Sequence, residues 1–342
     1  MDTYEVFRKW VPLVTEQDKV AVVKILTGTE DTLGNLTISY YLKLLLPYFE
    51  TIMQRELLHE LSQTDRLASG YVFFYGCLLY ACHFPNPAIH IPQLIRFNLL
   101  YILLDHYVDN CTPEELRRSL PQMYILLKDP HVHVDYHHPF LKYIAVIYQD
   151  LICISPHAKA SLLTLFEAEI KGCQIQSSSR HDRRAYYDIA LRKGGNTIQV
   201  LPYIVDPIAS STGICSPEIN AAAYLIGGII QLIDDSIDVY IDMENNIHTI
   251  ATHELAITGN LDTLWYEIIR LLETLSPQFN IFRVVYSIFA AYIPDRVPVY
   301  SEDLRALTTK HNMFDYRKGC DGSQLLARYI RYEIDSWIYY PI

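Results

Sequence analysis

The sequence lacks the features that mark several large classes of protein. It has no Gly/Ser-rich linker, no low-complexity segment and no internal repeat, which predicts a single domain over residues 1–342. Its seven cysteines stand singly, with no CxxC pair, which favours reduced thiols in a reducing compartment. The start has no signal-peptide pattern, and no apolar run is long enough to span a bilayer. We therefore expect a cytoplasmic protein without a transmembrane segment.

An excess of basic residues is also lacking. Lys and Arg total 28 against 39 Asp and Glu, which gives a formal net charge of −11. Binding to a phosphate backbone draws on clustered Lys and Arg, so we expect no nucleic-acid partner. The apolar share is 50%, and a chain of 342 residues with that composition can bury a large core.

Strict alternation of apolar and polar residues is scarce, so few strands are expected. Apolar residues instead recur every three or four positions, as in 40–61 and 264–275, which is typical of helices. Thr112-Pro113 with Glu115 has the pattern of a helix start with a capping box. The sequence therefore predicts an all-α helical bundle. The expected helices cover residues 36–60, 64–83, 92–110, 113–128, 140–153, 156–176, 182–212, 217–246, 261–275, 279–292, 301–318 and 323–338.

An acidic stretch, LIDDSIDVYID (232–242), follows an uncharged apolar run. Asp234, Asp238 and Asp242 are spaced to share one helix face, and Asp235 lies one step round. The nearest Lys or Arg in the sequence are Lys193 upstream and Arg270 downstream. Unpaired buried carboxylates are strongly disfavoured, so this stretch predicts a bound divalent cation.

A second acidic pair ends another apolar helix, LYILLDHYVDN (100–110), where Asp105 and Asp109 are four residues apart. One such pair is as typical of a solvated helix face as of a site. Two pairs can face each other across a bundle cavity, and all-oxygen ligands suit Mg²⁺ or Mn²⁺. Because Mg²⁺ readily shares phosphate oxygens with a substrate, the two pairs together predict a diphosphate held by metal.

These motifs resemble those of the isoprenoid synthase superfamily. LLDHYVDN (103–110) is similar to the first Asp-rich motif in a DxxxD form, and QLIDDSIDVYIDMENN (231–246) is similar to the second. YYDIALRKGGNTIQVLPYI (186–204) lies where the superfamily often has a helix broken near the substrate, with Gly194 and Gly195 at the break. The motif pair looks closest to large-terpene synthases of the tetraprenyl-β-curcumene synthase type. The basic stretch typical of chain-elongating synthases is absent from the start.

The resemblance implies a central active-site cavity, a linear prenyl diphosphate substrate, and Mg²⁺ with Mn²⁺ as a substitute. It leaves a homodimer open. The implied catalytic and metal-binding residues are Asp105, Asp109, Asp234, Asp238 and Asp242, with Asp235 as a further metal ligand. The implied substrate-binding residues are Arg192, Lys193, Gln231, Arg331 and Tyr332. Aromatic candidates for the cavity wall are Phe73, Phe74, Tyr101, Tyr107, Tyr224 and Tyr286.

Three functions are compatible with the sequence. The first is a Mg²⁺-dependent class I terpene synthase, which ionises a prenyl diphosphate and forms a terpene through carbocations. The second is a head-to-head condensing enzyme similar to squalene and phytoene synthases, supported by Gln231 followed by acids at steps of three and four. The third is a non-catalytic protein that binds prenyl diphosphates on the same fold.

Overall fold

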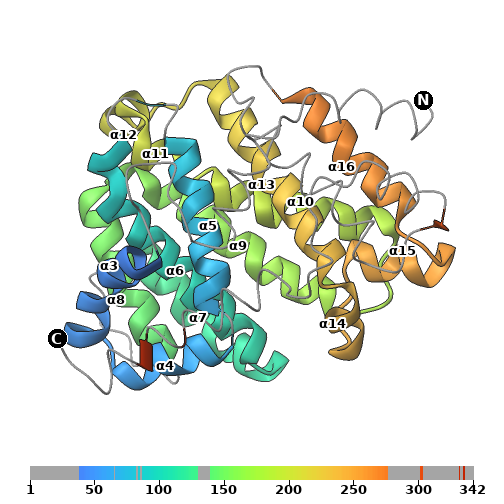
Figure 1. Cartoon of the computed structure of the whole chain (residues 1–342), viewed down its shortest axis with the longest axis horizontal. Helices are drawn as coiled ribbons and strands as arrows, with labels where there is room; N and C mark the ends of the chain where they lie inside the picture. Colours follow the sequence, from blue (N-terminus) through green and yellow to red (C-terminus); the bar gives the residue numbers. More distant parts are fainter. Residues whose placement is uncertain are drawn as a thin grey trace. The chain divides into compact units, whose positions relative to one another are not determined.

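Every regular element in the described part of the chain is a helix (Figure 1). The computed structural model describes residues 38–64, 66–81, 84, 87–129, 139–275, 301–302, 331 and 334–335. These residues contain no β-strand, which confirms the all-α prediction. None of their helices is long and apolar enough to cross a membrane.

The described helices belong to two compact units, which divide the chain at Lys159, Pro202 and Gly213. Unit 1 holds α9 (Lys159–Gln176), α10 (Arg183–Ile198), α13 (Pro217–Ile237), α14 (Val239–Glu244), α15 (Ile250–Thr258) and α16 (Asp262–Thr274). Unit 2 holds α3 (Ile38–Thr51), α4 (Arg55–Gln63), α5 (Arg66–Ala81), η2 (Pro87–His90), α6 (Ile91–Asn110), α7 (Pro113–Lys128), α8 (Pro139–Ile154), η3 (Pro156–Ala158), α11 (Pro202–Val205) and α12 (Pro207–Thr212).

Helix α6 of unit 2 packs against α5 and α8, and more than half of its residues are buried. Its buried Asn98 accepts a hydrogen bond from the Tyr41 hydroxyl (2.6 Å) and donates one to the Gly70 carbonyl (2.7 Å). A buried amide with both its oxygen and its nitrogen satisfied fixes the rotation of α6 against α3 and α5. That rotation sets where the last turns of α6, with Asp105 and Asp109, face.

Helices α10 and α13 of unit 1 cross at two pairs of glycines. A Cβ added to Gly194 would lie 2.1 Å from the Gly227 carbonyl oxygen, and one added to Gly227 would lie 1.9 Å from the Gly194 carbonyl oxygen. Only glycine permits this approach of two helix backbones. The crossing places Gly194 of α10, the residue after Lys193, against the α13 turn that carries Gln231, since a Cβ on Gly194 would also meet Gln231 at 2.8 Å.

An ion cluster with one buried member, Glu254, joins α10 to α15 and α16. Arg183, at the start of α10, donates to Glu254 (2.5 Å) and to Glu267 (2.8 Å). Glu254 is 3% exposed and also accepts a hydrogen bond from the Leu264 backbone N–H. Burial raises the pKa of Glu254, while Arg183 opposes that rise. Charged groups this deep need such partners, so the cluster fixes the frame around α10.

Several helix boundaries confirm the sequence patterns, and others correct them. The predicted capping box of Thr112 and Glu115 is present. Ser216 caps the start of α13 by accepting a hydrogen bond from the Ile219 N–H. The predicted helix 182–212 is wrong: it divides into α10, α11 and α12, because Pro202 and Pro207 each begin a new helix. The break therefore lies after Ile198. The prediction that Gly194 and Gly195 break the helix is wrong, since both lie inside α10.

Two further corrections concern the C-terminal half. The predicted helix 217–246 turns at Asp238 (φ −90°, ψ 6°) and divides into α13 and α14. Helix α15 was missed, although Thr249 caps its start and Gly259, with φ 75°, ends it. The predicted helix 279–292 lies outside the described residues, as do most of 301–318 and 323–338.

The glycine crossing predicts the effect of Gly227→Ala. Alanine normally stabilises a helix interior relative to glycine by about 1 kcal/mol. Here the added methyl group meets the α10 backbone, so the free energy of unfolding should fall by about 1–3 kcal/mol. Urea denaturation followed by far-UV circular dichroism measures this change. Ala221→Gly, on the exposed part of α13, reports the local helix propensity. A rise in stability for Gly227→Ala would contradict the close crossing.

Candidate functional site

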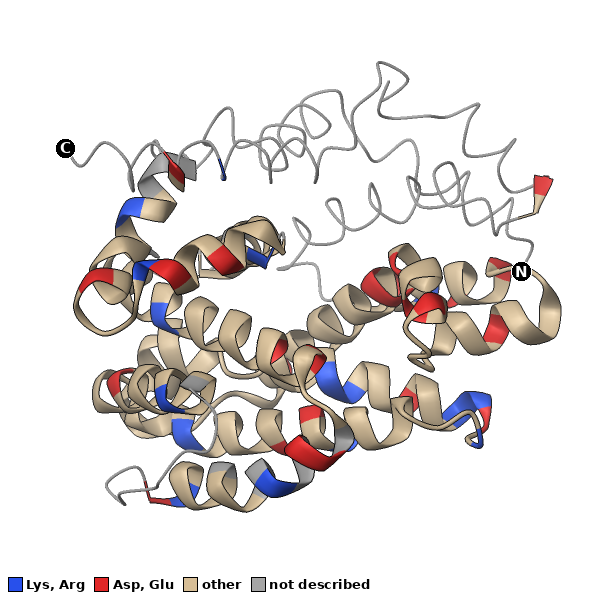
Figure 2. Ribbon diagram, turned by 90° about the horizontal axis from the view of Figure 1, so that it is seen from below, with Lys and Arg blue, Asp and Glu red and all other residues tan. Residues whose placement is uncertain are grey.

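Acidic and basic residues are spread over many of the described helices, so charge alone does not locate a site (Figure 2). The end of α13 differs because its carboxylates are partly buried. The Asp238 N–H donates to the Asp234 carbonyl (3.0 Å), and the Asp242 N–H donates to the Asp238 carbonyl (2.8 Å). These bonds continue the four-residue register across the turn into α14. The predicted spacing of the three aspartates along the backbone is therefore preserved.

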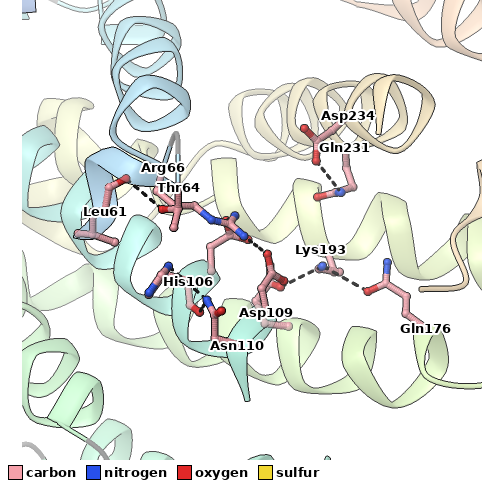
Figure 3. Close-up of polar contacts among 12 residues, drawn as sticks. Leu61, Thr64, Arg66, His106, Asp109, Asn110, Gln176, Lys193, Gln231 and Asp234 are labelled. Atoms are coloured by element: carbon pink, nitrogen blue, oxygen red, sulfur yellow. Dashed lines mark hydrogen bonds and ion pairs between the residues drawn. The ribbon is translucent and has the colours of Figure 1, made fainter. Parts of the chain in front are cut away.

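Asp235 is the buried carboxylate at this end of α13. It is 4% exposed, and its Oδ1 accepts a hydrogen bond from Gln231 Nε2 at 3.0 Å. Its Oδ2 is buried and has no hydrogen-bond partner within the described residues. Burial raises the pKa of Asp235 to about 6, although Gln231 and Lys193 oppose the rise. Asp234 is exposed, and Gln231 reaches it at 3.5 Å (Figure 3).

Asp235, Asp238 and Asp242 form what we call the acidic cluster. Burial, followed by the negative charges of Asp235 and Asp238, raises the pKa of Asp242 to about 7. Thr249 donates a hydrogen bond to Asp242 and partly opposes that rise. Three carboxylates close enough to shift one another's pKa favour a cation among them. The sequence patterns favoured Asp234 over Asp235 as a metal ligand. The structure distinguishes the two by burial, since Asp235 is buried and Asp234 is exposed.

Lys193 supplies positive charge to the acidic cluster from another helix. Its charge lowers the pKa of both Asp235 and Asp242. Its side chain is 13% exposed, and its Nζ lies 3.2 Å from Glu169 Oε2 on α9. Along the sequence, the nearest basic residues are far from the acidic stretch. In the structure, the packing of α10 on α13 brings Lys193 close enough to act on its carboxylates. Arg192, its neighbour, is exposed.

The donor chemistry of the acidic cluster fits Mg²⁺. All its ligand atoms are carboxylate oxygens, and the buried Oδ2 of Asp235 lacks a partner among the described residues. Within the same residues, no group of three or more His, Cys, Asp or Glu side chains is placed to hold a metal ion together. Mg²⁺ usually binds proteins through one or two carboxylates and keeps waters or phosphate oxygens, so it does not need such a group.

The acidic pair of unit 2 is occupied by an arginine. Arg66, at the start of α5, makes ion pairs with both Asp105 and Asp109. Figure 3 shows Arg66 directed toward Asp109. Burial lowers the pKa of Arg66, but the two carboxylates more than reverse this, and the pKa lies above its ordinary value. A guanidinium that bridges two carboxylates is a strong, directional contact. The sequence analysis missed Arg66, which lies 39 residues before Asp105 and has no local signal.

The end of α4 holds the region before Arg66 in place. The Thr64 hydroxyl donates to the Leu61 carbonyl (3.0 Å), and Arg331 donates to the carbonyls of Ser62 (2.9 Å) and Gln63 (2.8 Å). Arg331 thus satisfies carbonyls that a helix end leaves without partners. It was predicted to bind substrate. Its predicted companion Tyr332 lies outside the described residues.

The aromatic candidates divide by burial. Phe74 and Tyr107 are fully buried, at 0% and 1% exposed, and belong to the core. Phe73 and Tyr101 are partly exposed and stack on each other, with ring centroids 4.6 Å apart. Tyr224 is partly exposed on α13, and its ring fills the space that a side chain at Gly195 would need. Tyr286 lies outside the described residues.

Comparison with known proteins adds no family. No protein-family model matches the chain, and no curated protein matches it. A function is therefore inferred from the residues of the acidic cluster and the acidic pair.

The raised pKa of Asp242 predicts a pH-dependent stability. A carboxyl whose folded pKa is about 7 binds protons more readily in the folded state than in the unfolded state, so stability falls as pH rises from about 4 to about 7. Asp242→Asn should therefore raise the free energy of unfolding by about 1–2 kcal/mol at about pH 8 and by little at about pH 4. Urea denaturation with EDTA measures this. Glu244→Gln, exposed on the same helix, should show no such trend.

The Arg66 bridge predicts a stability loss that a divalent cation reverses. Asp105 and Asp109 are 32% and 41% exposed, so Arg66→Gln should lower the free energy of unfolding by only about 1 kcal/mol in EDTA. Added Mg²⁺ should restore the free energy of unfolding of this variant if the two carboxylates also bind metal. Arg118→Gln breaks a fully exposed pair on α7 and serves as the control in the same thermal-melting assay. Equal losses with no effect of Mg²⁺ would exclude metal binding by this pair.

Proposed function

We propose that the chain is a Mg²⁺-dependent class I terpene synthase. It acts on a linear prenyl diphosphate, releases diphosphate and forms a terpene through carbocations. The observation that carries the proposal is the acidic cluster, in which a buried carboxylate oxygen without a hydrogen-bond partner in the described residues lies beside two further carboxylates and a lysine. The proposal includes the single isoprenoid synthase-like domain with its central cavity that the motifs imply.

The acidic residues of the cluster and the nearby lysine would have different roles. One or two of Asp235, Asp238 and Asp242 would hold the cation, and Gln231 fixes the orientation of Asp235 through the 3.0 Å hydrogen bond. Bound Mg²⁺ supplies Lewis-acid chemistry, because it neutralises a diphosphate and improves it as a leaving group. Lys193 adds an ammonium donor for diphosphate oxygens close to the same carboxylates. Asp105 and Asp109 provide a second place for a cation, where Arg66 is the counter-ion now.

The half-buried aromatic residues suit the carbocation step of the proposed reaction. An allylic cation is stabilised by the faces of aromatic rings in a water-poor site. Phe73 on α5 stacks on Tyr101 of α6 in unit 2, and Tyr101 lies one helical turn before Asp105. Head-to-head condensation requires the same cation chemistry with two substrate molecules, so product analysis decides between the two reactions.

A non-catalytic binding protein is the second candidate, and the Arg66 bridge is the observation that favours it. Asp105 and Asp109 are already neutralised by a residue of the chain. Such a pair can serve structure rather than metal binding. In that case the acidic cluster alone would bind a metal–diphosphate complex, without the second site that the synthase chemistry calls for.

A product assay tests the proposal. Purified protein is incubated with individual prenyl diphosphates of increasing chain length, with Mg²⁺ or EDTA, and the organic extract is analysed by gas chromatography and mass spectrometry. We expect a terpene from one substrate that needs Mg²⁺ and that Asp238→Asn reduces by about a hundredfold or more, as the loss of a transition-state contact does.

The controls separate the candidates. Glu244→Gln is exposed on α14 near the cluster and should retain activity. A product with a doubled carbon skeleton would replace cyclisation by head-to-head condensation. Metal-dependent binding of the substrates without any product would leave the binding protein. Absence of both binding and product would overturn the proposal for this site.

A further inference from the structure

One face of α9 is shaped to hold a single lysine. Glu169, Gly172 and Gln176 are spaced three and four residues apart, so they share one face of the helix. Lys193 Nζ lies 3.2 Å from Glu169 Oε2 and 3.5 Å from Gln176 Oε1. Its carbon chain lies over Gly172, where an added Cβ would meet Lys193 Cδ at 2.5 Å. We call these three residues the lysine cradle.

The cradle itself is buried and anchored. The side chain of Glu169 is 9% exposed, which is uncommon for an acid unless it is paired. The Gln176 carbonyl accepts a hydrogen bond from the His248 N–H at 2.8 Å, which joins the end of α9 to the segment after α14. The Thr197 hydroxyl donates to the Lys193 carbonyl, so the backbone of Lys193 is also held. The ammonium therefore has a defined place.

Lys193 stands between two sets of acids. Glu169 attracts its ammonium from the side of α9. Its neighbour Gly194 packs against Gln231 of α13, which donates a hydrogen bond to Asp235 of the acidic cluster. A lysine drawn fully into the acidic cluster would compete with a divalent cation for the same oxygens. The ammonium is compact and its stem is flexible, so its position depends on such partners.

We propose that Glu169 is a positioning residue that limits competition between Lys193 and a divalent cation for the acidic cluster. Glu169 shares the ammonium, Gly172 gives its stem room against α9, and Gln176 provides a further acceptor. The carboxylates thereby keep their affinity for the cation while Lys193 stays near enough to bind an anionic ligand. This inference rests on the proposed metal-binding role of the cluster.

A double-mutant cycle on Mn²⁺ affinity tests the inference. Electron paramagnetic resonance measures free Mn²⁺ with the full chain, without substrate or turnover. Lys193→Gln should tighten Mn²⁺ binding by about tenfold, because a competing charge is lost, and Glu169→Gln should weaken it by about threefold to tenfold. With Lys193→Gln already present, Glu169→Gln should change the affinity by less than about twofold, since its effect requires the lysine.

Two further variants separate positioning from simple loss of charge. Glu167→Gln removes the same charge from an exposed position on α9 and should leave Mn²⁺ affinity unchanged. Gly172→Ala changes no charge and favours the helix, but it displaces the Lys193 stem and should weaken Mn²⁺ binding in the same direction as Glu169→Gln. It also keeps the test valid if Glu169→Gln fails to fold.

The outcomes are distinct. Coupled effects of Glu169 and Lys193, with weaker binding for Gly172→Ala, support the inference. Additive effects, or equal effects of Glu167→Gln and Glu169→Gln, overturn it and leave the proposed function intact. If the wild-type chain binds no Mn²⁺, or binds it equally well after Asp235→Asn, the proposed metal role of the cluster fails and the inference fails with it.

Discussion

The close approach of α10 and α13 is the constraint on which the acidic cluster depends. Backbone contact at Gly194 and Gly227 leaves no room for side chains at the crossing. Residues next to the crossing are therefore brought close to the opposite helix: Gly194 packs against Gln231 of α13, and Lys193 is its neighbour on α10. Gln231 orients Asp235 one turn further along, and Lys193 acts on the same carboxylate. The arrangement of Gln231 and Lys193 around Asp235 thus depends on the two glycines at the crossing.

The charges around this crossing are arranged at a cost to stability. Asp235 is buried with one oxygen that lacks a hydrogen bond in the described part of the chain, and Asp242 sits beside two like charges. Such groups destabilise a fold unless a ligand compensates them. The Arg183 cluster nearby shows the opposite arrangement, in which buried Glu254 is paired with Arg183 and with a backbone N–H. Within one unit, the paired acids hold helices together, and the incompletely paired acid belongs to the candidate site.

The sequence predicted what periodicity and local spacing determine. The three- and four-residue periodicity of apolar residues predicted most of the described helices. A proline after a capping residue indicated the starts of α7 and α13. The four-residue spacing of the aspartates also persists. Contacts between distant segments could not be predicted this way: Arg66 reaches Asp105, and Lys193 reaches the acidic cluster, only through tertiary packing. The sequence predicted a helix break at Gly194 and Gly195, but the contact with Gly227 shows that they serve a helix crossing.

The two acidic sites differ in the residue that balances them, and this difference has chemical consequences. Arg66 bridges Asp105 and Asp109 with a planar fork that remains charged at any physiological pH. A cation can take its place only by breaking two directional contacts together. Lys193 is a point charge on a flexible stem that is shared between Glu169 and the acidic cluster, so it can yield to a cation by small movements. By this argument the acidic cluster would accept a cation at lower cost than the acidic pair. The pair would accept one only if a further anion bound the freed guanidinium of Arg66.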